Sequence, residues 1–359
     1  MKACLFYVVS LLVTLTLARP FENAVVRATP DLPRLVIYYQ TTHDSSGKPI
    51  SMLPLITEKN IALTHLIVCS LHMNVNSVMH LNDYPPSDPR FNTLWAEADV
   101  LKNAGVKIMG MIGGAAGGSF STSTLDGNDA AFAQYYGQLH DIITTYGLQG
   151  MDLDVEQPMS QAGITRLVHR LYQDFGPDFL ITLAPVASAL ENSANLSGFD
   201  YETLEAAAGN EIAFYNGQFY NGFGSMANTR DFDAVVANGW DPRKILAGQP
   251  TSPEDGSSFI PFATLNATII SLRNKYGEIG GIMGWEYFNS EPGGLSEPWE
   301  WAQQMTAILR PDKSVKLFIT AETAENLESA WESSVSGVVE ASEAVHTGPT
   351  VDYRAMINA

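Results

Sequence analysis

The sequence predicts an α/β fold in which eight strand–helix units close into a barrel. Short apolar runs rich in β-branched residues alternate with longer stretches of helical periodicity. Runs this apolar are typical of parallel strands that helices cover, and their repetition over residues 33–310 matches the size of a (β/α)8 or TIM barrel, roughly 250 residues. An open, doubly wound sheet is disfavoured because no Gly-x-Gly-x-x-Gly turn follows the first run. The expected strands are residues 35–39, 66–71, 107–112, 150–155, 179–184, 212–220, 244–248 and 280–287.

Helices are readable between several of these strands. Asp129 is expected to cap a helix whose apolar residues recur at a period near 3.6 until Gly147 ends it. A second helix is predicted over residues 160–175, before Gly176-Pro177. Residues 252–280 leave room for one loop and one helix between the last two strands. We therefore expect a barrel without a large α+β insertion.

The N-terminus predicts a secreted protein. Met1-Lys2 precedes an apolar run over residues 3–17, which ends in Thr16-Leu17-Ala18 before Arg19-Pro20. This pattern is typical of a secretory signal peptide, and the run is shorter than the roughly 20 residues that a membrane span needs. We predict a signal peptide over residues 1–18 and an extracellular location. In a secreted chain, Asn195 and Asn266 begin sequence motifs for glycosylation.

The remaining segments flank the barrel. Residues 19–32 are predicted to be a linker or pro-segment, and residues 33–310 the barrel. Residues 311–359 form an acidic tail rich in Ser, Ala and Glu, which we expect to be partly helical, over 321–334, or disordered.

Charge and cysteine content limit the partners and the source of stability. The chain has 39 acidic and 20 basic residues, a net charge of −19, which disfavours binding to the phosphates of nucleic acid. We expect a monomer that binds no nucleic acid and no membrane. Cys4 lies in the predicted signal peptide, so Cys69 is the one thiol of the mature chain and no internal disulfide can form. Its apolar neighbours indicate a buried structural thiol rather than a nucleophile.

The residues with the clearest chemical meaning lie on the fourth predicted strand. Because side chains alternate along a strand, Asp152, Asp154 and Glu156 share one face and the apolar residues between them share the other. In a barrel these acids project inward and climb toward the C-terminal mouth, where barrel enzymes place their sites. Such crowding costs several kcal/mol unless protons are shared or hydrogen bonds are made. The alternatives are a solvent-exposed edge strand and a divalent-metal site, but no further His or acid cluster accompanies the series.

At these residues the chain resembles family 18 of the glycoside hydrolases, which contains chitinases and endo-β-N-acetylglucosaminidases. The family motif Asp-x-x-Asp-x-Asp-x-Glu is matched at its last three acids, with Gln149 at the first position. Other similarities follow in barrel order along residues 33–310. They are Met111-Ile112-Gly113-Gly114 on the third strand, Gln218-Phe219-Tyr220-Asn221 on the sixth and Trp285 on the eighth.

The resemblance implies substrate-assisted, retaining cleavage after an N-acetylglucosamine, without a cofactor or metal. Glu156 would be the acid and base, Asp154 would orient the 2-acetamido group, and Asp152 would hold Asp154. Tyr220 would donate its hydroxyl to the acetamido carbonyl. The resemblance assigns substrate binding to Gln218, Asn221, Trp285, Gly113 and Gly114.

Each supporting residue also has a structural reading. Trp285 would be a core residue, the two glycines would serve a tight turn, and Tyr220 would be a packing residue. His65 and His72 are expected to be structural.

The substrate is expected to be the chitobiose core of N-glycans. The missing insertion predicts an open cleft, and His65-Leu66-Ile67-Val68 and His80-Leu81-Asn82-Asp83 resemble secreted fungal endo-β-N-acetylglucosaminidases. The alternatives are a chitinase acting on chitin or its oligomers, and a lectin-like barrel that only binds chitin or glycans. The presence of Glu156 disfavours pure binding.

Overall fold

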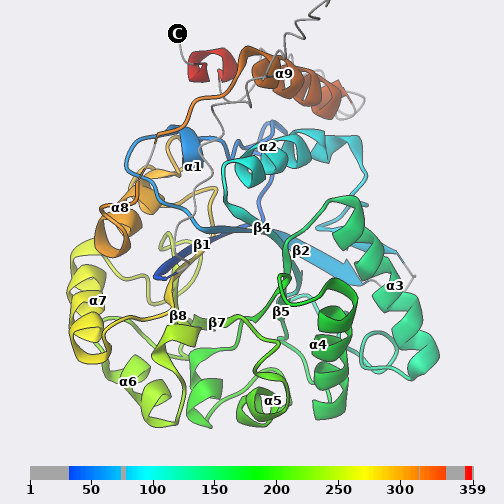
Figure 1. The fold of residues 1–359 in the computed structure, drawn as a ribbon, viewed down its shortest axis with the longest axis vertical. Helices are drawn as coiled ribbons and strands as arrows, with labels where there is room; N and C mark the ends of the chain where they lie inside the picture. Colours follow the sequence, from blue (N-terminus) through cyan, green and yellow to red (C-terminus); the bar gives the residue numbers. More distant parts are fainter. Residues whose placement is uncertain (1–31, 74–77, 315, 337–351, 358–359) are drawn as a thin grey trace, which may run out of the picture.

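A computed structural model describes residues 32–73, 78–314, 316–336 and 352–357 of the chain. Eight parallel strands form a closed ring with helices around it, which confirms the predicted (β/α)8 barrel (Figure 1). The ring runs in the order β1-β9-β8-β7-β6-β5-β4-β2, and β1 pairs with β2 to close it. The strands are β1 Arg34–Tyr39, β2 His65–Met73, β4 Lys107–Gly113, β5 Gly150–Asp154, β6 Leu180–Leu183, β7 Phe214–Gln218, β8 Ile245–Pro250 and β9 Gly281–Trp285.

One further strand and the helices complete the described part of the chain. The short strand β3, Met79–Leu81, pairs antiparallel with β2. A single helix, α7, lies between β8 and β9, so the predicted absence of a large insertion there is confirmed. The helices are α1 Pro54–Thr57, α2 Asn92–Asn103, α3 Asp129–Thr145, α4 Gln161–Phe175, α5 Tyr201–Ala208, α6 Arg230–Ala237, α7 Phe262–Tyr276, α8 Glu300–Leu309 and α9 Ala321–Ser336. Four 3-10 turns are η1 Pro89–Phe91, η2 Ala187–Glu191, η3 Pro242–Lys244 and η5 Tyr353–Met356.

Apolar side chains fill two separate layers. The larger layer lies between the strands and the helices, and the smaller one fills the barrel interior with Val36, Tyr38, Met109 and Phe214 among its members. Cys69 belongs to the interior cluster and is fully buried as a free thiol, which confirms its structural reading. The polar residues of the interior therefore stand out against apolar neighbours.

Closure of the ring depends on a glycine. Gly281 pairs with Arg34 across the β9–β1 seam and has φ +135°. A Cβ at this position would lie 1.9 Å from the carbonyl oxygen of Arg34. Only glycine permits this close approach of the two strands.

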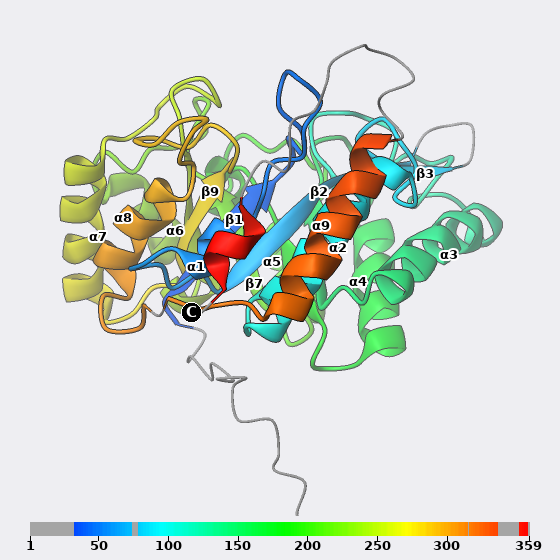
Figure 2. The same cartoon turned by 90° about the horizontal axis from the view of Figure 1, so that it is seen from above.

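The segment after residue 310 packs on the barrel. Helix α9 lies beside α2 in both ribbon views (Figures 1 and 2), and Leu327 and Trp331 on it are buried. The amide of Thr93 donates to Ser334 Oγ over 2.9 Å. Farther along, the Tyr353 hydroxyl donates to the buried carboxylate of Glu97 over 2.7 Å. The helix expected over 321–334 is thus α9, and residues 337–351 lie outside the described residues.

Several predicted boundaries needed correction. Helix α3 is capped by Asn128, whose side chain accepts from the Ala131 amide, whereas Asp129 is its first residue. The sixth strand is shorter than the predicted 212–220, because its pairing ends at Gln218 and Tyr220 lies beyond it. The predicted signal peptide and nearly all of the segment 19–32 lie outside the described residues, so both stay predictions.

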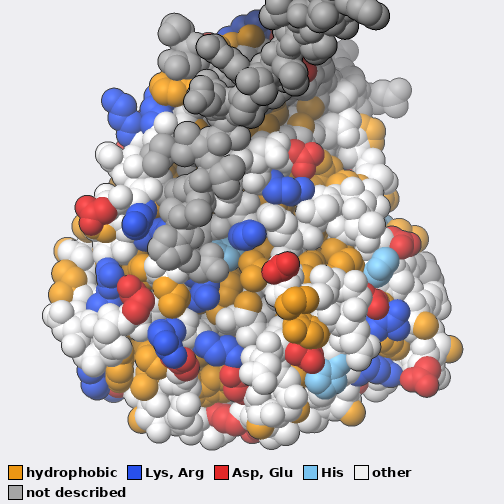
Figure 3. All heavy atoms as spheres, in the orientation of Figure 1, with side chains coloured by type: hydrophobic (Ala, Val, Ile, Leu, Met, Phe, Trp, Pro, Cys, Tyr) orange, Lys and Arg blue, Asp and Glu red, His pale blue; other side chains and the backbone are white. Residues whose placement is uncertain are grey.

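The surface mixes charges of both signs. On the face drawn in Figure 3, acidic and basic side chains are interspersed among the described residues, with no continuous basic patch. Within the described ranges, no helix has both the length and the hydropathy of a bilayer-spanning segment.

Candidate active site

Strand β5 carries its acids into the barrel, as predicted from the alternation. Met151 and Leu153 pack in the outer layer against the helices. Asp152 and Asp154 point the other way and are 0% and 5% exposed. Glu156 lies just beyond the end of the strand and is partly exposed at the mouth. The three carboxylates therefore differ in their access to solvent.

Asp152 is enclosed by hydrogen-bond donors from three other strands. The Tyr38 hydroxyl of β1 donates to Oδ2 over 2.6 Å, and the Thr182 hydroxyl of β6 donates to Oδ1 over 2.5 Å. The Asn216 amide of β7 also donates to Oδ1, over 3.1 Å. Burial raises the pKa of Asp152, and these hydrogen bonds counter part of that rise. The arrangement holds Asp152 in place beneath the mouth.

Asp154 and Glu156 share a donor from β7. The side-chain amide of Gln218 lies 3.2 Å from Asp154 Oδ1 and 3.3 Å from Glu156 Oε1, and it also donates to the carbonyl oxygen of Ala184 over 2.9 Å. Burial raises the pKa of Asp154 well above its ordinary value, and the charges of Glu156 and Asp152 raise it further. Asp154 is therefore hard to ionise in this position.

Tyr220 and Trp285 complete the wall of this site. Burial, followed by the charges of Asp154 and Glu156, raises the pKa of Tyr220, so its hydroxyl remains a donor. This hydroxyl makes no hydrogen bond to any other described residue. Trp285 ends β9, is partly exposed, and its ring centroid lies 5.6 Å from that of Tyr38. A donor and an aromatic face are thus available beside the carboxylates.

Asn221 supports a neighbouring loop. Its side-chain oxygen accepts from the Ser257 amide over 2.8 Å, and its backbone has φ +55°. The structure thus places this predicted substrate residue against the loop that follows β8.

Two glycines allow the loop after β4 to lie against Asp154. Gly113 has φ +108°, and a Cβ there would lie 2.1 Å from the Asp154 carbonyl oxygen. The Gly114 amide donates to the same oxygen over 2.9 Å. A Cβ on Gly114 would lie 3.7 Å from Asp154 Oδ2, so this glycine also borders the carboxylate. The two glycines therefore both form a tight turn and border the candidate active site.

Gln149 lies at the opposite end of β5. Its side-chain oxygen accepts from the Ile108 amide over 3.1 Å, at the entry of the neighbouring strand. The position where the family motif has its first acid is therefore occupied by an amide that joins two strands, away from the carboxylates at the mouth.

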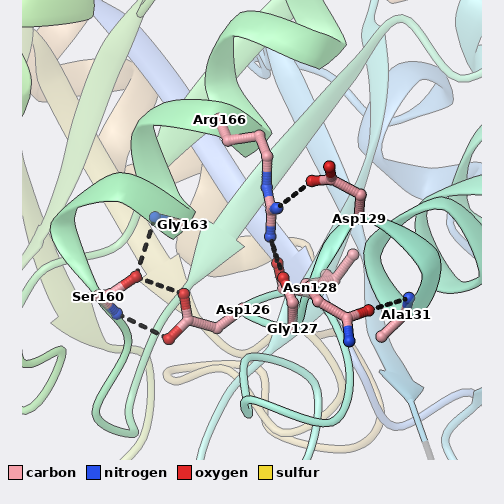
Figure 4. A network of polar contacts seen from close by, with 9 residues as sticks. Asp126, Gly127, Asn128, Asp129, Ala131, Ser160, Gly163 and Arg166 are labelled. Carbon is pink, nitrogen blue, oxygen red and sulfur yellow. Dashed lines mark hydrogen bonds and ion pairs between the residues drawn. The ribbon is translucent and has the colours of Figure 1, made fainter.

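The loop that carries Glu156 is tied to the loop after β4. Figure 4 shows Asp126 accepting from the Ser160 hydroxyl over 2.5 Å and from its amide over 3.0 Å. Ser160 caps α4, and Arg166 on that helix donates to the Gly127 carbonyl over 2.7 Å. These contacts hold the loop between β5 and α4, which contains Glu156, in a fixed position.

The sequence reasoning missed four polar residues near the site. Tyr38, Thr182 and Asn216 surround Asp152, and their inward positions on apolar strands were the signal that could have identified them. Glu286, next to Trp285, is buried and accepts from the Thr41 amide over 2.8 Å. Burial raises the pKa of Glu286, and its contacts fix the loop after β1.

Other predicted residues lie apart from this chemistry. His65 is buried beside Thr64, and burial lowers its pKa to about 3. In the ranges that the structure describes, no group of three or more His, Cys, Asp or Glu side chains is placed to hold a metal ion. Asn195 lies in the loop before α5, with its amide donating to the Phe199 carbonyl over 2.7 Å, and Asn266 lies on α7. Glycosylation at both positions stays a prediction.

The chain matches a family model and several proteins of known structure. The family model described as glycosyl hydrolases family 18 matches residues 34–251. A fungal endo-β-N-acetylglucosaminidase of known structure is 67% identical, with a TM-score of 0.77, and the match covers 79% of this chain and 100% of that one. A chitinase structure from Aspergillus fumigatus is 45% identical, with a TM-score of 0.70, over 76% of this chain and 98% of that one.

The curated relatives are longer proteins. Chitinase 2 of Rhizopus oligosporus is 29% identical over 245 residues, which cover 62% of this chain. The match spans 43% of the length of that relative.

Proposed function

Because the chain belongs to the glycosyl hydrolases of family 18, we propose that it is a secreted endo-β-N-acetylglucosaminidase that cleaves the chitobiose core of N-glycans. The observation that supports hydrolysis most directly is the pair of Asp154 and Glu156 at the mouth, one buried and one accessible, joined by the Gln218 amide. A carboxyl group that can reach substrate beside a second carboxyl that is hard to ionise suits acid–base chemistry.

The proposed reaction uses the substrate's own acetamido group as nucleophile. Glu156 donates its proton to the glycosidic oxygen as the bond from that oxygen to C1 breaks, and the acetamido oxygen bonds to C1. The resulting oxazolinium is positively charged, and Asp154 stabilises it. Water then adds to C1 with retention of configuration and gives a proton to Glu156, while the acetamido oxygen is released.

The surrounding side chains fit the same reaction. The unpaired Tyr220 hydroxyl can donate to the acetamido oxygen, and the partly exposed face of Trp285 can support the sugar ring. Asp152, held by its three donors, keeps a second negative charge below Asp154 and opposes that residue's ionisation before substrate arrives.

The preference for N-glycans rests on the chain's relatives and on its open mouth. The fungal endo-β-N-acetylglucosaminidase is more similar in sequence than the Aspergillus chitinase, at 67% against 45% identity. The single helix between β8 and β9 leaves no second domain to wall a deep cleft for polymer. Chitinase activity is the second candidate, favoured by the chitinase relatives.

The test is hydrolysis of a high-mannose glycoprotein and of chitin oligomers by the wild-type protein and by Glu156→Gln. We expect release of the glycan with one N-acetylglucosamine left on the protein, and a loss of at least 1,000-fold, about 4 kcal/mol, in the variant. Glu322→Gln, which changes an exposed acid on α9, is the matched control and should keep full activity. Cleavage of chitin oligomers alone would favour the chitinase reading, and no cleavage of either substrate would favour a binding protein.

A further inference from the structure

A polar pocket of about 490 Å³ lies beside the candidate active site. Three loops of the barrel mouth build it, those that follow β1, β2 with β3, and β4. Its volume lies in the range of about 300–1,000 Å³ that is typical of small-molecule sites. The lining residues are Gln40, Thr41, Thr42, His43, His72, Asn82, Asp83, Tyr84, Arg90, Phe91 and Ala116.

The pocket shares a wall with the active site. Glu286, the neighbour of Trp285, accepts from the amides of Gln40 and Thr41 over 3.1 and 2.8 Å. The Asn82 side chain donates to the Gln40 carbonyl over 2.9 Å and accepts from the Ser70 amide. Gln40 is therefore fixed by its backbone on both sides, at a point between the two sites.

Three polar side chains that line the pocket have hydrogen-bonding groups without a partner among the described residues. Those of Gln40, His72 and Asp83 make no hydrogen bond to any other described residue. Burial lowers the pKa of His72, so its ring is neutral at physiological pH and can both donate and accept. Together they offer donors and acceptors of the kind that match sugar hydroxyl groups.

The two aromatic rings that line this pocket are partly or fully covered by the protein. The Arg90 guanidinium covers the ring of Tyr84, with its central carbon 3.1 Å from the ring centroid. Phe91 is 1% exposed and belongs to the core. The lining therefore offers mainly hydrogen-bonding groups, with one face of the Tyr84 ring taken by Arg90.

A larger groove of about 970 Å³ lies between α3 and α4, but its described lining residues include no such unpaired charged side chains. Its charged side chains already have partners within the protein, since Arg166 bonds backbone carbonyls, Arg170 pairs with Asp174 and His169 pairs with Glu211. Its lining residues all belong to these two helices.

We propose that the polar pocket binds a hydroxyl-rich branch of the substrate and so selects a branched hexose-bearing glycan over a linear chitin chain. This inference rests on the proposed function and assigns its specificity to Gln40, His72 and Asp83. The fixed backbone supplies a preformed wall, and the three unpaired side chains supply the hydrogen bonds that discriminate.

The test compares two glycopeptides with the same scissile bond, one with a full high-mannose glycan and one trimmed to chitobiose and a single mannose. In the variant with both His72→Ala and Asp83→Ala, kcat/KM on the full glycan should fall at least tenfold, mainly through KM. On the trimmed glycan it should change less than twofold. Gln40→Ala should also lower kcat/KM on the full glycan. Asp83→Asn should lower it less than Asp83→Ala does, because asparagine keeps a hydrogen-bonding side chain.

A second measurement separates recognition from folding and chemistry. Free high-mannose glycan should bind to the Glu156→Gln protein in calorimetry, and the pocket substitutions should weaken that binding at least tenfold without changing the thermal midpoint. Equal losses on both glycopeptides, or none on the full glycan, would overturn the pocket assignment while leaving the proposed function intact. If the wild-type protein cleaves neither glycopeptide, the proposed function fails and the pocket proposal fails with it.

Discussion

Glu97 should make the stability of this protein depend on pH through a site far from the carboxylates of the mouth. It lies on α2, is 0% exposed and accepts from the Ser51 hydroxyl, the Met52 amide and the Tyr353 hydroxyl over 2.8, 2.6 and 2.7 Å. Burial nevertheless raises its pKa from 4.5 to about 7. A glutamine at this position would keep the shape of the side chain and remove the titration.

The sign of the effect follows from the raised pKa. Between pH 4.5 and 7 the folded state holds a proton on Glu97 that the unfolded state has lost, so stability falls as pH rises through this interval and levels off above it. At about 1.4 kcal/mol per pH unit, the fall amounts to about 3 kcal/mol. Glu97→Gln should therefore gain about 3 kcal/mol over the wild-type protein between pH 4.5 and 8.

Urea unfolding of both proteins at several pH values measures this difference. The other charges of the chain titrate equally in the two proteins and cancel in the comparison. The surface substitution Glu322→Gln serves as control, and its free energy of unfolding should run parallel to that of the wild type. A difference between Glu97→Gln and wild type that stays constant from pH 4.5 to 8 would refute the reasoning.

Three further substitutions test how the mouth is held together. Tyr38→Phe removes the 2.6 Å hydrogen bond to Asp152, and we expect about 1.5–3 kcal/mol less unfolding free energy and about a tenfold lower kcat at unchanged KM. Gly113→Ala places a Cβ 2.1 Å from the Asp154 carbonyl oxygen at φ +108°, so most activity should be lost and the thermal midpoint lowered. Asp126→Ala releases the serine that caps α4, which should cost about 1–2 kcal/mol and lower kcat severalfold.

Matched controls exist for two of these substitutions. Tyr276→Phe removes a hydroxyl that bonds the surface carboxylate of Asp233 and should leave kcat unchanged. Gly117→Ala should be tolerated, because no atom would lie nearer than 3.7 Å to the new Cβ. Equal effects in the test and control variants would argue against the roles assigned to Tyr38 and Gly113.

The barrel could be predicted from the sequence because its signals are local. Period-2 and period-3.6 patterns depend on near neighbours, and they located all eight strands of the described ring. The cap of α3 was misplaced by one residue because Asn128 and Asp129 are both good capping residues. Which of the two side chains reaches the third amide depends on the backbone, which the pattern does not specify.

The candidate site could be predicted only in part, for a related reason. The acids of β5 lie in one short segment, so their shared face follows from alternation alone. Tyr38, Thr182 and Asn216 meet around Asp152 from three distant strands, and no local pattern states that they meet. The docking of Tyr353 on Glu97 was unforeseen because a lone tyrosine in an acidic tail carries no periodicity.

The enclosure of Asp152 also has a consequence for the lifetime of the folded state. Its donors Tyr38, Asn216 and Thr182 lie 114, 64 and 30 residues away in the chain. Thr182 lies on β6, directly beside β5, whereas Tyr38 lies on β1, across the ring from β5, so we expect the Tyr38 contact to form later. An interaction that is absent from the folding transition state mainly slows unfolding. We therefore predict that the hydrogen bond from Tyr38 to Asp152 slows unfolding of the barrel. Loss of a donor such as Tyr38 should speed unfolding while leaving the refolding rate almost unchanged.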